Sequence, residues 1–143
     1  ERYIGHSNIS YKIIKGKKSK LKSRNTVKLA DSILNTTSPY VFANKYDQRI
    51  FEEVVKDVKT VRLGGDCYSY CLLADGHVDI ILESGIKPWD IRALEPIIKN
   101  AGGILKTWEG DKIFNGGRII AAANKKLFKS TQNKLIKKKP SYS

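Results

Sequence analysis

The chain has 143 residues, which is enough for a single domain with a buried core. It carries 27 Lys and Arg against 14 Asp and Glu, and its formal net charge is +13. Such a charge suits an acidic partner, but 21 of the 27 cations are Lys, they are spread from Lys12 to Lys139, and aromatic residues are not interleaved with them. We therefore interpret the excess charge as a solvated Lys-rich surface and expect no nucleic-acid partner.

The two cysteines and the apolar runs indicate the compartment. Cys67 and Cys71 lie four residues apart in an apolar helical pattern, too close for an ordinary disulfide and too few for a zinc site. We expect both to be buried free thiols in a reducing compartment, and the protein to be cytoplasmic. The sequence has no run of 18 apolar residues and no charged leader before an apolar segment, so neither a membrane span nor a signal peptide is predicted.

Residues 1–28 predict antiparallel strands. Apolar residues alternate with polar ones up to Ile14, and a basic stretch containing Gly16 follows, so we expect hairpin strands with a Lys-rich loop. The chain contains no Met and opens at Glu1 within a predicted strand. We therefore expect it to be part of a longer protein, with residues 1–28 ending an amino-terminal domain that is not included.

Residues 29–137 predict a second unit in which strands and helices alternate. The expected strands are 33–38, 61–63, 78–82, 104–107 and 118–123, and the expected helices are 46–59, 67–74, 88–101 and a last helix capped by Asn124. Strands separated by single helices are typical of an α/β fold with crossover connections. Only residues 138–143, a basic tail, are expected to be disordered.

The segment from Glu83 to Gly103 carries the most informative motif. An apolar strand ends there in a turn with Gly85 and Pro88, which delivers Asp90 to the first turn of a helix. Backbone N–H groups and the helix dipole favour an ionised carboxylate at that position. The wording Glu-Ser-Gly-Ile-Lys-Pro-Trp-Asp, followed by a helix that ends at Ala-Gly-Gly, resembles the carboxy-terminal signature of the inositol monophosphatase family.

The resemblance runs from residues 1–5 to residues 118–124 and so covers nearly the whole chain. It implies a mixed sheet flanked by helices, the carboxy-terminal domain of an αβαβα sandwich. It also implies a phosphoric monoester hydrolase in which Asp90 is a ligand of catalytic Mg²⁺, because paired hard cations neutralise phosphoryl oxygens and activate a water. The alternative for Asp90 is a carboxylate that only stabilises its helix.

Within the family, residues 62–70 (Arg-Leu-Gly-Gly-Asp-Cys-Tyr-Ser-Tyr) are similar to the histidinol-phosphatase branch. Gly65 would let the backbone approach a ligand closely. Histidinol carries an ammonium group, so the resemblance implies that Asp66 and Glu83 hold that end of the substrate. The alternatives are a simple helix N-cap for Asp66 and a solvated strand end for Glu83.

The remaining metal ligands of the family lie in two upstream elements that this sequence lacks. Glu52 and Glu53 lie on a helical stripe without the preceding Gly, and the chain has no Asp-Pro dipeptide. The chain therefore holds a partial active site, with no catalytic residue beyond the metal ligand, and we expect it to be inactive without the missing amino-terminal half.

The resulting hypothesis is the carboxy-terminal part of a Mg²⁺-dependent histidinol-phosphatase of histidine biosynthesis, forming a homodimer when full length. An inositol-1-monophosphatase or a broad sugar-phosphate phosphatase is the alternative within the same class. A noncatalytic remnant or binding module is the alternative of another class, and a nucleic-acid binder that uses the +13 charge is a weaker one.

Overall fold

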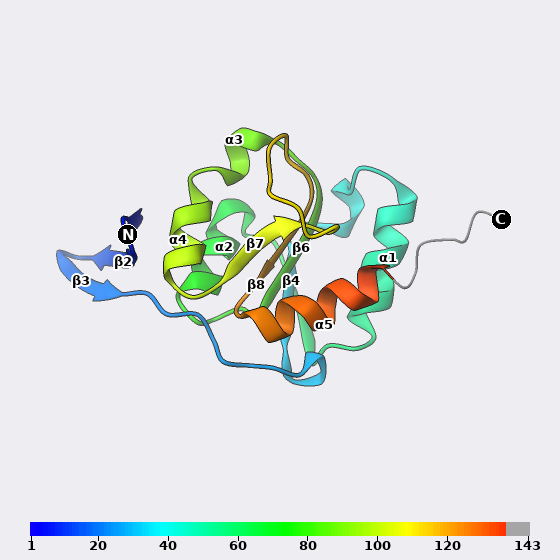
Figure 1. Cartoon of the computed structure of the whole chain (residues 1–143), viewed down its shortest axis with the longest axis horizontal. Helices are drawn as coiled ribbons and strands as arrows, with labels where there is room; N and C mark the ends of the chain where they lie inside the picture. The colour runs from blue at the N-terminus through cyan, green and yellow to red at the C-terminus, as the bar shows by residue number, and fades with distance from the viewer. Residues whose placement is uncertain (137–143) are drawn as a thin grey trace.

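The computed structural model describes residues 1–136 and contains two sheets (Figure 1). The first is a three-stranded antiparallel sheet of β1 (Arg2–His6), β2 (Ile9–Ile14) and β3 (Lys17–Lys20). The second is a five-stranded mixed sheet in the order β5-β4-β6-β8-β7. The expected α/β class with a mixed sheet flanked by helices is confirmed.

The large sheet consists of β4 (Ile33–Thr36), β5 (Thr60–Leu63), β6 (Ile80–Ile86), β7 (Ile104–Thr107) and β8 (Gly117–Ala122). The helices are α1 (Lys45–Val55), α2 (Asp66–Ala74), α3 (Pro88–Ile91), α4 (Leu94–Asn100) and α5 (Lys125–Ile136), with 3-10 turns η1 (Leu29–Asp31) and η2 (Pro39–Val41). Strands β5, β4 and β6 run parallel, whereas β8 is antiparallel to both of its neighbours.

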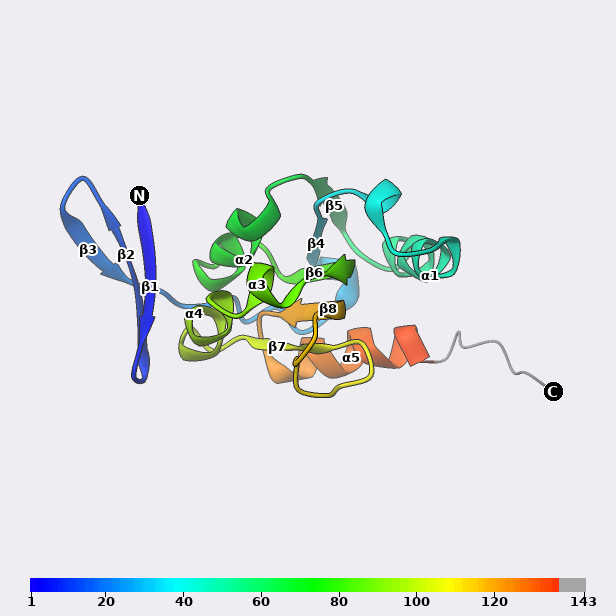
Figure 2. The ribbon, with the colours of Figure 1, turned by 90° about the horizontal axis from the view of Figure 1, so that it is seen from above.

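Helices cover both faces of the large sheet, and each face has its own apolar core. One core joins α1 and α5 to the sheet around Leu34, Leu82 and Ile120, and the other joins α2 and α4 to it around Ile81 and Ile119. These residues alternate along their strands, as the two-residue period of a strand requires. Figure 2 shows the small sheet at one end of the molecule, next to α4.

The small sheet packs closely on α4. A Cβ atom added to Gly5 of β1 would lie 2.6 Å from the backbone N of Ile97, so only glycine permits this approach. The first strands pair antiparallel as the predicted hairpins require, and the basic stretch after Gly16 is strand β3. It pairs with β2 through Tyr11 and Lys20, and the Lys18 ammonium lies 3.7 Å from the centre of the Tyr11 ring.

Two asparagines begin the long helices. Asn44 Oδ1 accepts a hydrogen bond from Asp47 N at 2.8 Å at the start of α1. Asn124 Oδ1 accepts one from Leu127 N at 3.0 Å at the start of α5, which confirms the predicted cap.

The single helix expected over 88–101 is instead two helices separated by a turn at Arg92 and Ala93. Pro96 explains the break, because it has no N–H for the Arg92 carbonyl and its ring would clash with that group in a continuous helix. In the observed structure Pro96 lies in the first turn of α4, where a missing N–H costs nothing.

The cysteines differ from expectation. Cys71 is a buried free thiol, as predicted, but Cys67 is exposed, so the expectation that both are buried is wrong. Cys67 lies in the first turn of α2.

The expected tail, residues 138–143, lies outside the described residues. Among the helices of residues 1–136, none combines the length and the apolar composition needed to cross a membrane.

Candidate active site

The candidate site lies at the carboxyl ends of β4, β5 and β6. Strands β4 and β6 are parallel neighbours, with Leu34 opposite Ile80, so their carboxyl ends meet at the same edge of the sheet. The chain leaves β4 towards α1 on one face and leaves β6 towards α3 and α4 on the other. A crevice forms where neighbouring strands connect to opposite faces, and this is the general ligand position in open α/β sheets.

Glu83 is buried on β6 at this edge, with 4% of its surface exposed. Its Oε1 accepts hydrogen bonds from the backbone N of Thr37, at 3.1 Å, and from the Thr37 hydroxyl. Its Oε2 accepts one from the Tyr70 hydroxyl at 2.7 Å. The alternative of a solvated strand end is therefore wrong, because the side chain is held inside the protein by two other elements.

Tyr70 of α2 is a fixed donor to Glu83. Burial, followed by the negative charge of Glu83, raises the pKa of Tyr70 well above its usual value. The phenol therefore stays protonated and keeps donating to the carboxylate.

Asp66 is exposed and begins α2 with a φ of +44°, a left-handed conformation that Asp tolerates better than most residues. The N-cap position belongs to Gly65, so the alternative in which Asp66 is the N-cap is wrong. In the described part of the chain, its carboxylate has no hydrogen bond or ion pair.

The structure explains why position 65 is a glycine. Its φ is +105°, and an added Cβ would lie 2.3 Å from Ser69 Oγ. That hydroxyl donates to the Gly64 carbonyl at 2.9 Å. A close approach of Gly65 to a ligand remains a prediction.

Asp90 is exposed in the first turn of α3, as the motif predicts. Its Oδ2 accepts a hydrogen bond from the backbone N of Lys87 at 3.1 Å, so it contributes to the cap of α3. A carboxylate has about four lone-pair positions, so this one hydrogen bond leaves the Asp90 carboxylate free to bind a cation.

Two adjoining hollows bring these residues together. The larger, with a volume of about 510 Å³, is lined by Asp66, Glu83 and Asp90 together with the rings of Tyr70 and Trp89. The smaller, of about 220 Å³, shares Asp66 and Glu83 and adds hydroxyl side chains such as Ser38 and Ser84. The structure thus brings together all three carboxylates singled out from the sequence.

The charge of the hollows is opposite to that of the chain. The described residues lining them include three carboxylates and no Lys, Arg or His, although the formal net charge of the chain is +13. An anionic hollow attracts cations, whether a metal ion or an ammonium group.

The donor set fits Mg²⁺ as one part of a site. Mg²⁺ prefers oxygen ligands and is commonly held by one or two carboxylates together with substrate phosphate. Asp90 offers such an oxygen on the rim of the larger hollow. Within residues 1–136 no three acidic, His or Cys side chains converge as a complete metal-binding group.

Sequence reasoning missed the residues that hold Glu83. Thr37 and Tyr70 are 46 and 13 residues from it in sequence, so no local pattern could pair them with it. The run Thr36-Thr37-Ser38 at the carboxyl end of β4 was an available signal, because ligands bind at the carboxyl ends of strands in open α/β sheets.

Comparison with known proteins gives a consistent result. The sequence profile of the inositol monophosphatase family matches residues 6–140. The chain is 38% identical over 117 residues to the bifunctional phosphatase IMPL2 of Arabidopsis thaliana, covering 78% of this chain and 31% of that protein. It is 43% identical over 61 residues to a histidinol-phosphatase of Mycobacterium tuberculosis, covering 43% of this chain and 24% of that protein.

A solved structure of an inositol monophosphatase from Zymomonas mobilis superimposes with a TM-score of 0.79 at 31% sequence identity. The match covers 90% of this chain and 53% of that one. The chain thus spans about half of this relative and a third or less of the two curated ones. The profile match over almost the whole chain, together with this shared fold, places the chain in the inositol monophosphatase family.

Proposed function

We propose that the chain is the carboxy-terminal part of a Mg²⁺-dependent phosphomonoesterase that hydrolyses histidinol phosphate to histidinol and inorganic phosphate. The observation that carries the proposal is the anionic hollow, which three carboxylates line within a strongly basic chain. A phosphate ester is itself anionic, so this hollow suits it only if a metal cation accompanies the phosphate and a cationic group lies at the other end.

Asp90 is the residue that would hold Mg²⁺. The ion would supply charge neutralisation at the phosphoryl oxygens and an activated water. Lys87 N–H orients the Asp90 carboxylate by binding Oδ2, and Trp89 covers the same rim of the larger hollow.

Glu83 and Asp66 would hold the ammonium end of the substrate. Three of the four lone-pair positions of the Glu83 carboxylate are occupied, which leaves one on Oε2 for an N–H donor. Both carboxylates lack a cationic partner among the described residues, so an ammonium group would neutralise charge that the protein leaves uncompensated.

Hydrolysis of inositol phosphate or another sugar phosphate is the second candidate, supported by the 31% identity to the Zymomonas mobilis inositol monophosphatase. The two candidates differ in the charge of the substrate beyond its phosphate. A noncatalytic half-site is the candidate of another class, and it is consistent with the incomplete metal group. A homodimer and a cytoplasmic location remain predictions for the full-length protein.

The experiment that tests the proposal measures phosphate release by the full-length protein as Mg²⁺ is varied, for the wild type and for Asp90→Asn. Asn keeps an oxygen that can accept from Lys87 N–H, so the variant should fold, with a melting temperature close to that of the wild type. Loss of the charge should weaken Mg²⁺ binding and reduce kcat by at least about 100-fold.

Near-normal activity of Asp90→Asn at the usual Mg²⁺ concentration would mean that Asp90 only caps α3. Equal kcat/KM for histidinol phosphate and inositol phosphate in the wild type would favour the second candidate. No phosphate release from any ester by the wild type would favour the noncatalytic half-site.

A further inference from the structure

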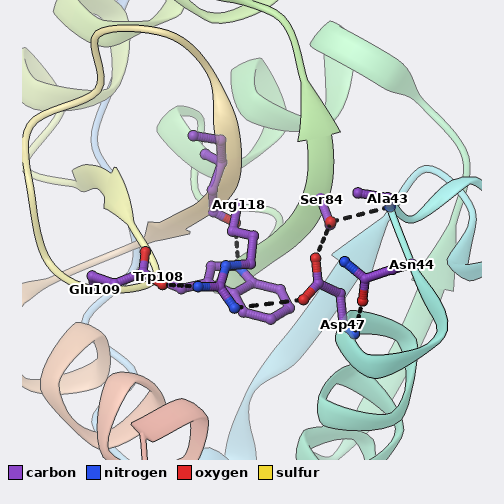
Figure 3. A network of polar contacts seen from close by, with 8 residues as sticks. Ala43, Asn44, Asp47, Ser84, Trp108, Glu109 and Arg118 are labelled. Atoms are coloured by element: carbon purple, nitrogen blue, oxygen red, sulfur yellow. Dashed lines mark hydrogen bonds and ion pairs between the residues drawn. The ribbon is translucent and has the colours of Figure 1, made fainter. Parts of the chain in front are cut away.

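A network beside the smaller hollow centres on Asp47 in the first turn of α1 (Figure 3). Only 2% of this residue is exposed, so its carboxylate requires partners inside the protein. Oδ2 accepts a hydrogen bond from the Ser84 hydroxyl of β6, and Oδ1 lies 3.5 Å from Arg118 Nη1 of β8. The network therefore joins three elements that are distant in sequence.

Arg118 is held in place by two further contacts. Its Nη2 forms an ion pair with Glu109, and its guanidinium carbon lies 5.6 Å from the centre of the Trp108 ring. Trp108 is buried, and its Nε1 donates to the Ile119 carbonyl at 3.0 Å. Asp47 is thus a buried charge with a fixed counterion, which makes it a rigid acceptor for Ser84.

Ser84 lies at the start of the bulge in β6. It follows Glu83 directly and points to the opposite face of the sheet, towards α1. The pairing of β6 with β8 is interrupted between Glu83 and Ile86, and Gly85 in this bulge has a φ of +81°. Gly85 has no side chain to hold the bulge, so the Ser84 hydroxyl is the side-chain anchor at this point on the α1 face.

The same hydroxyl also fixes the opposite wall of the smaller hollow. It accepts a hydrogen bond from the backbone N of Ala43 at 3.1 Å. Ala43 follows η2 and Phe42, and both Val41 and Phe42 line that hollow. One hydroxyl therefore connects the wall at η2, the bulge in β6 and the N-terminus of α1.

We propose that Ser84, held by Asp47, is a positioning residue that fixes the bulge at residues 84–85 and so sets where Asp90 lies relative to Glu83. The bulge is the connection between these two carboxylates, since Glu83 directly precedes it and Asp90 lies five residues after Gly85. The functional part of the inference rests on the proposed phosphatase function. Its structural part, that this hydroxyl holds residues 85–90, does not.

The test compares Ser84→Ala with Ser23→Ala in the full-length protein. Ser23 is a matched control, because it is a buried serine whose hydroxyl bonds the Ala101 and Ala123 carbonyls away from both hollows. Five quantities are measured for each variant: hydrogen exchange of the backbone amides of residues 85–90, Mg²⁺ affinity by calorimetry, the melting temperature, and kcat and KM for histidinol phosphate.

In Ser84→Ala, the amides of residues 85–90 should exchange at least about fivefold faster, and Mg²⁺ should bind about tenfold more weakly, since one hydrogen bond no longer holds the bulge. The value of kcat should fall with little change in the fluorescence or circular dichroism of the folded protein. Both variants should lower the melting temperature by a similar amount, because each loses a buried, hydrogen-bonded hydroxyl. Ser23→Ala, however, should leave the exchange rates of residues 85–90 and the Mg²⁺ affinity unchanged.

Asp47→Asn separates the hydroxyl contact from the ion pair. The Asn oxygen can still accept from Ser84, whereas Arg118 loses its buried counterion. This variant should be less stable than the wild type. The backbone amides of its residues 85–90 should nevertheless exchange their hydrogens within about twofold of the wild-type rate.

Unchanged exchange at residues 85–90 in Ser84→Ala, or an equal increase in Ser23→Ala, would overturn the proposal. Faster exchange with unaltered Mg²⁺ affinity and kcat would also overturn it, because the bulge would then not set the position of Asp90. If the wild type releases no phosphate from any ester, the proposed function has failed, and hydrogen exchange together with Mg²⁺ calorimetry still decides the positioning role.

Discussion

Three carboxylates line the same hollow, but their surroundings differ at the level of single residues. Glu83 is buried and accepts three hydrogen bonds, Asp66 is exposed without a partner in the described residues, and Asp90 is exposed and accepts one bond from Lys87. Glu83 is therefore a fixed charge, whereas Asp66 can adjust to a ligand. This difference suits a site in which one carboxylate sets the position of a cationic group and the other strengthens its binding.

Asp66→Asn in the full-length protein should reduce selectivity for a cationic substrate. Asn tolerates the left-handed conformation at this position about as well as Asp, so the fold should be retained. The ratio of kcat/KM for histidinol phosphate to that for inositol phosphate should fall by about 10- to 100-fold, which corresponds to the loss of one charge-assisted hydrogen bond. An equal loss for both substrates would show that Asp66 has only a structural role.

Cys71 should make the protein less stable in alkali. Burial, and then the neighbouring Cys67, raise the pKa of the Cys71 thiol from 9.0 to about 11. A raised pKa in the folded state means that the contribution to stability is complete below pH 9 and is lost as the pH rises towards 11.

The free energy of unfolding, measured in urea between pH 8 and pH 11, should therefore fall less steeply for Cys71→Ala than for the wild type. Cys67→Ala is the comparison variant, because it removes only the smaller of these two causes, and its slope should stay closer to that of the wild type than the slope of Cys71→Ala does. Identical slopes for all three proteins would show that Cys71 does not govern the alkaline limb.

At the level of elements, the end of β6 is held by its neighbours rather than by its own pairing. Its ladder with β8 is interrupted after Glu83 and resumes where Ile86 meets Gly117. The adjacent Gly116 lies so close that an added Cβ would be 1.9 Å from the Ile86 carbonyl oxygen. The loop between β7 and β8 thus packs directly against the end of β6 that leads to Asp90.

Gly116→Ala should consequently destabilise the protein much more than Gly117→Ala. Both glycines have positive φ values, of +74° and +96°, so each substitution costs about 1 to 2 kcal/mol of backbone strain. Only Gly116→Ala adds a clash with backbone, which should bring its total to about 3 kcal/mol or more. Urea unfolding of the two variants measures the difference, and equal destabilisation would contradict the close packing of this loop on β6.

At the level of the whole molecule, the chain consists of a large sheet with helices on both faces and a small sheet packed on α4 (Figure 2). Within residues 1–136, the small sheet shares no strand pairing with the large one. This separation agrees with the expectation that residues 1–28 end a different domain, which remains a prediction. In the proposed function, residues 1–136 hold only part of the metal site, because the other metal ligands would come from the amino-terminal half of the protein.

The 143-residue chain alone should therefore release no phosphate from histidinol phosphate above background in the presence of Mg²⁺. It holds one proposed metal ligand, whereas two-metal hydrolysis needs several carboxylates. The full-length protein, assayed in parallel, is the control. Turnover by the isolated chain at about 1 per second or faster would show that the amino-terminal half is not essential.

Much of the fold could be predicted because its signals are local. The apolar alternation of the strands, the cap at Asn124 and the turn before Asp90 each depend on residues within a few positions of one another. The helix break at Arg92 was also local, since Pro96 excludes a continuous helix. The exposure of Cys67 could not be predicted from local signals, because an apolar pattern does not show which side of a short helix faces the sheet.

By itself, the sequence determined the type and order of most elements, the likeness of the Asp90 motif to a phosphatase family and the large positive charge. Only the tertiary structure decided that Asp66, Glu83 and Asp90 line one hollow, that Glu83 is buried against Thr37 and Tyr70, and that Asp47 anchors Ser84. The reason is physical. Hydrophobic period and capping act over a few residues, whereas these contacts join side chains up to 46 residues apart, whose meeting depends on strand order and on the face that each helix covers.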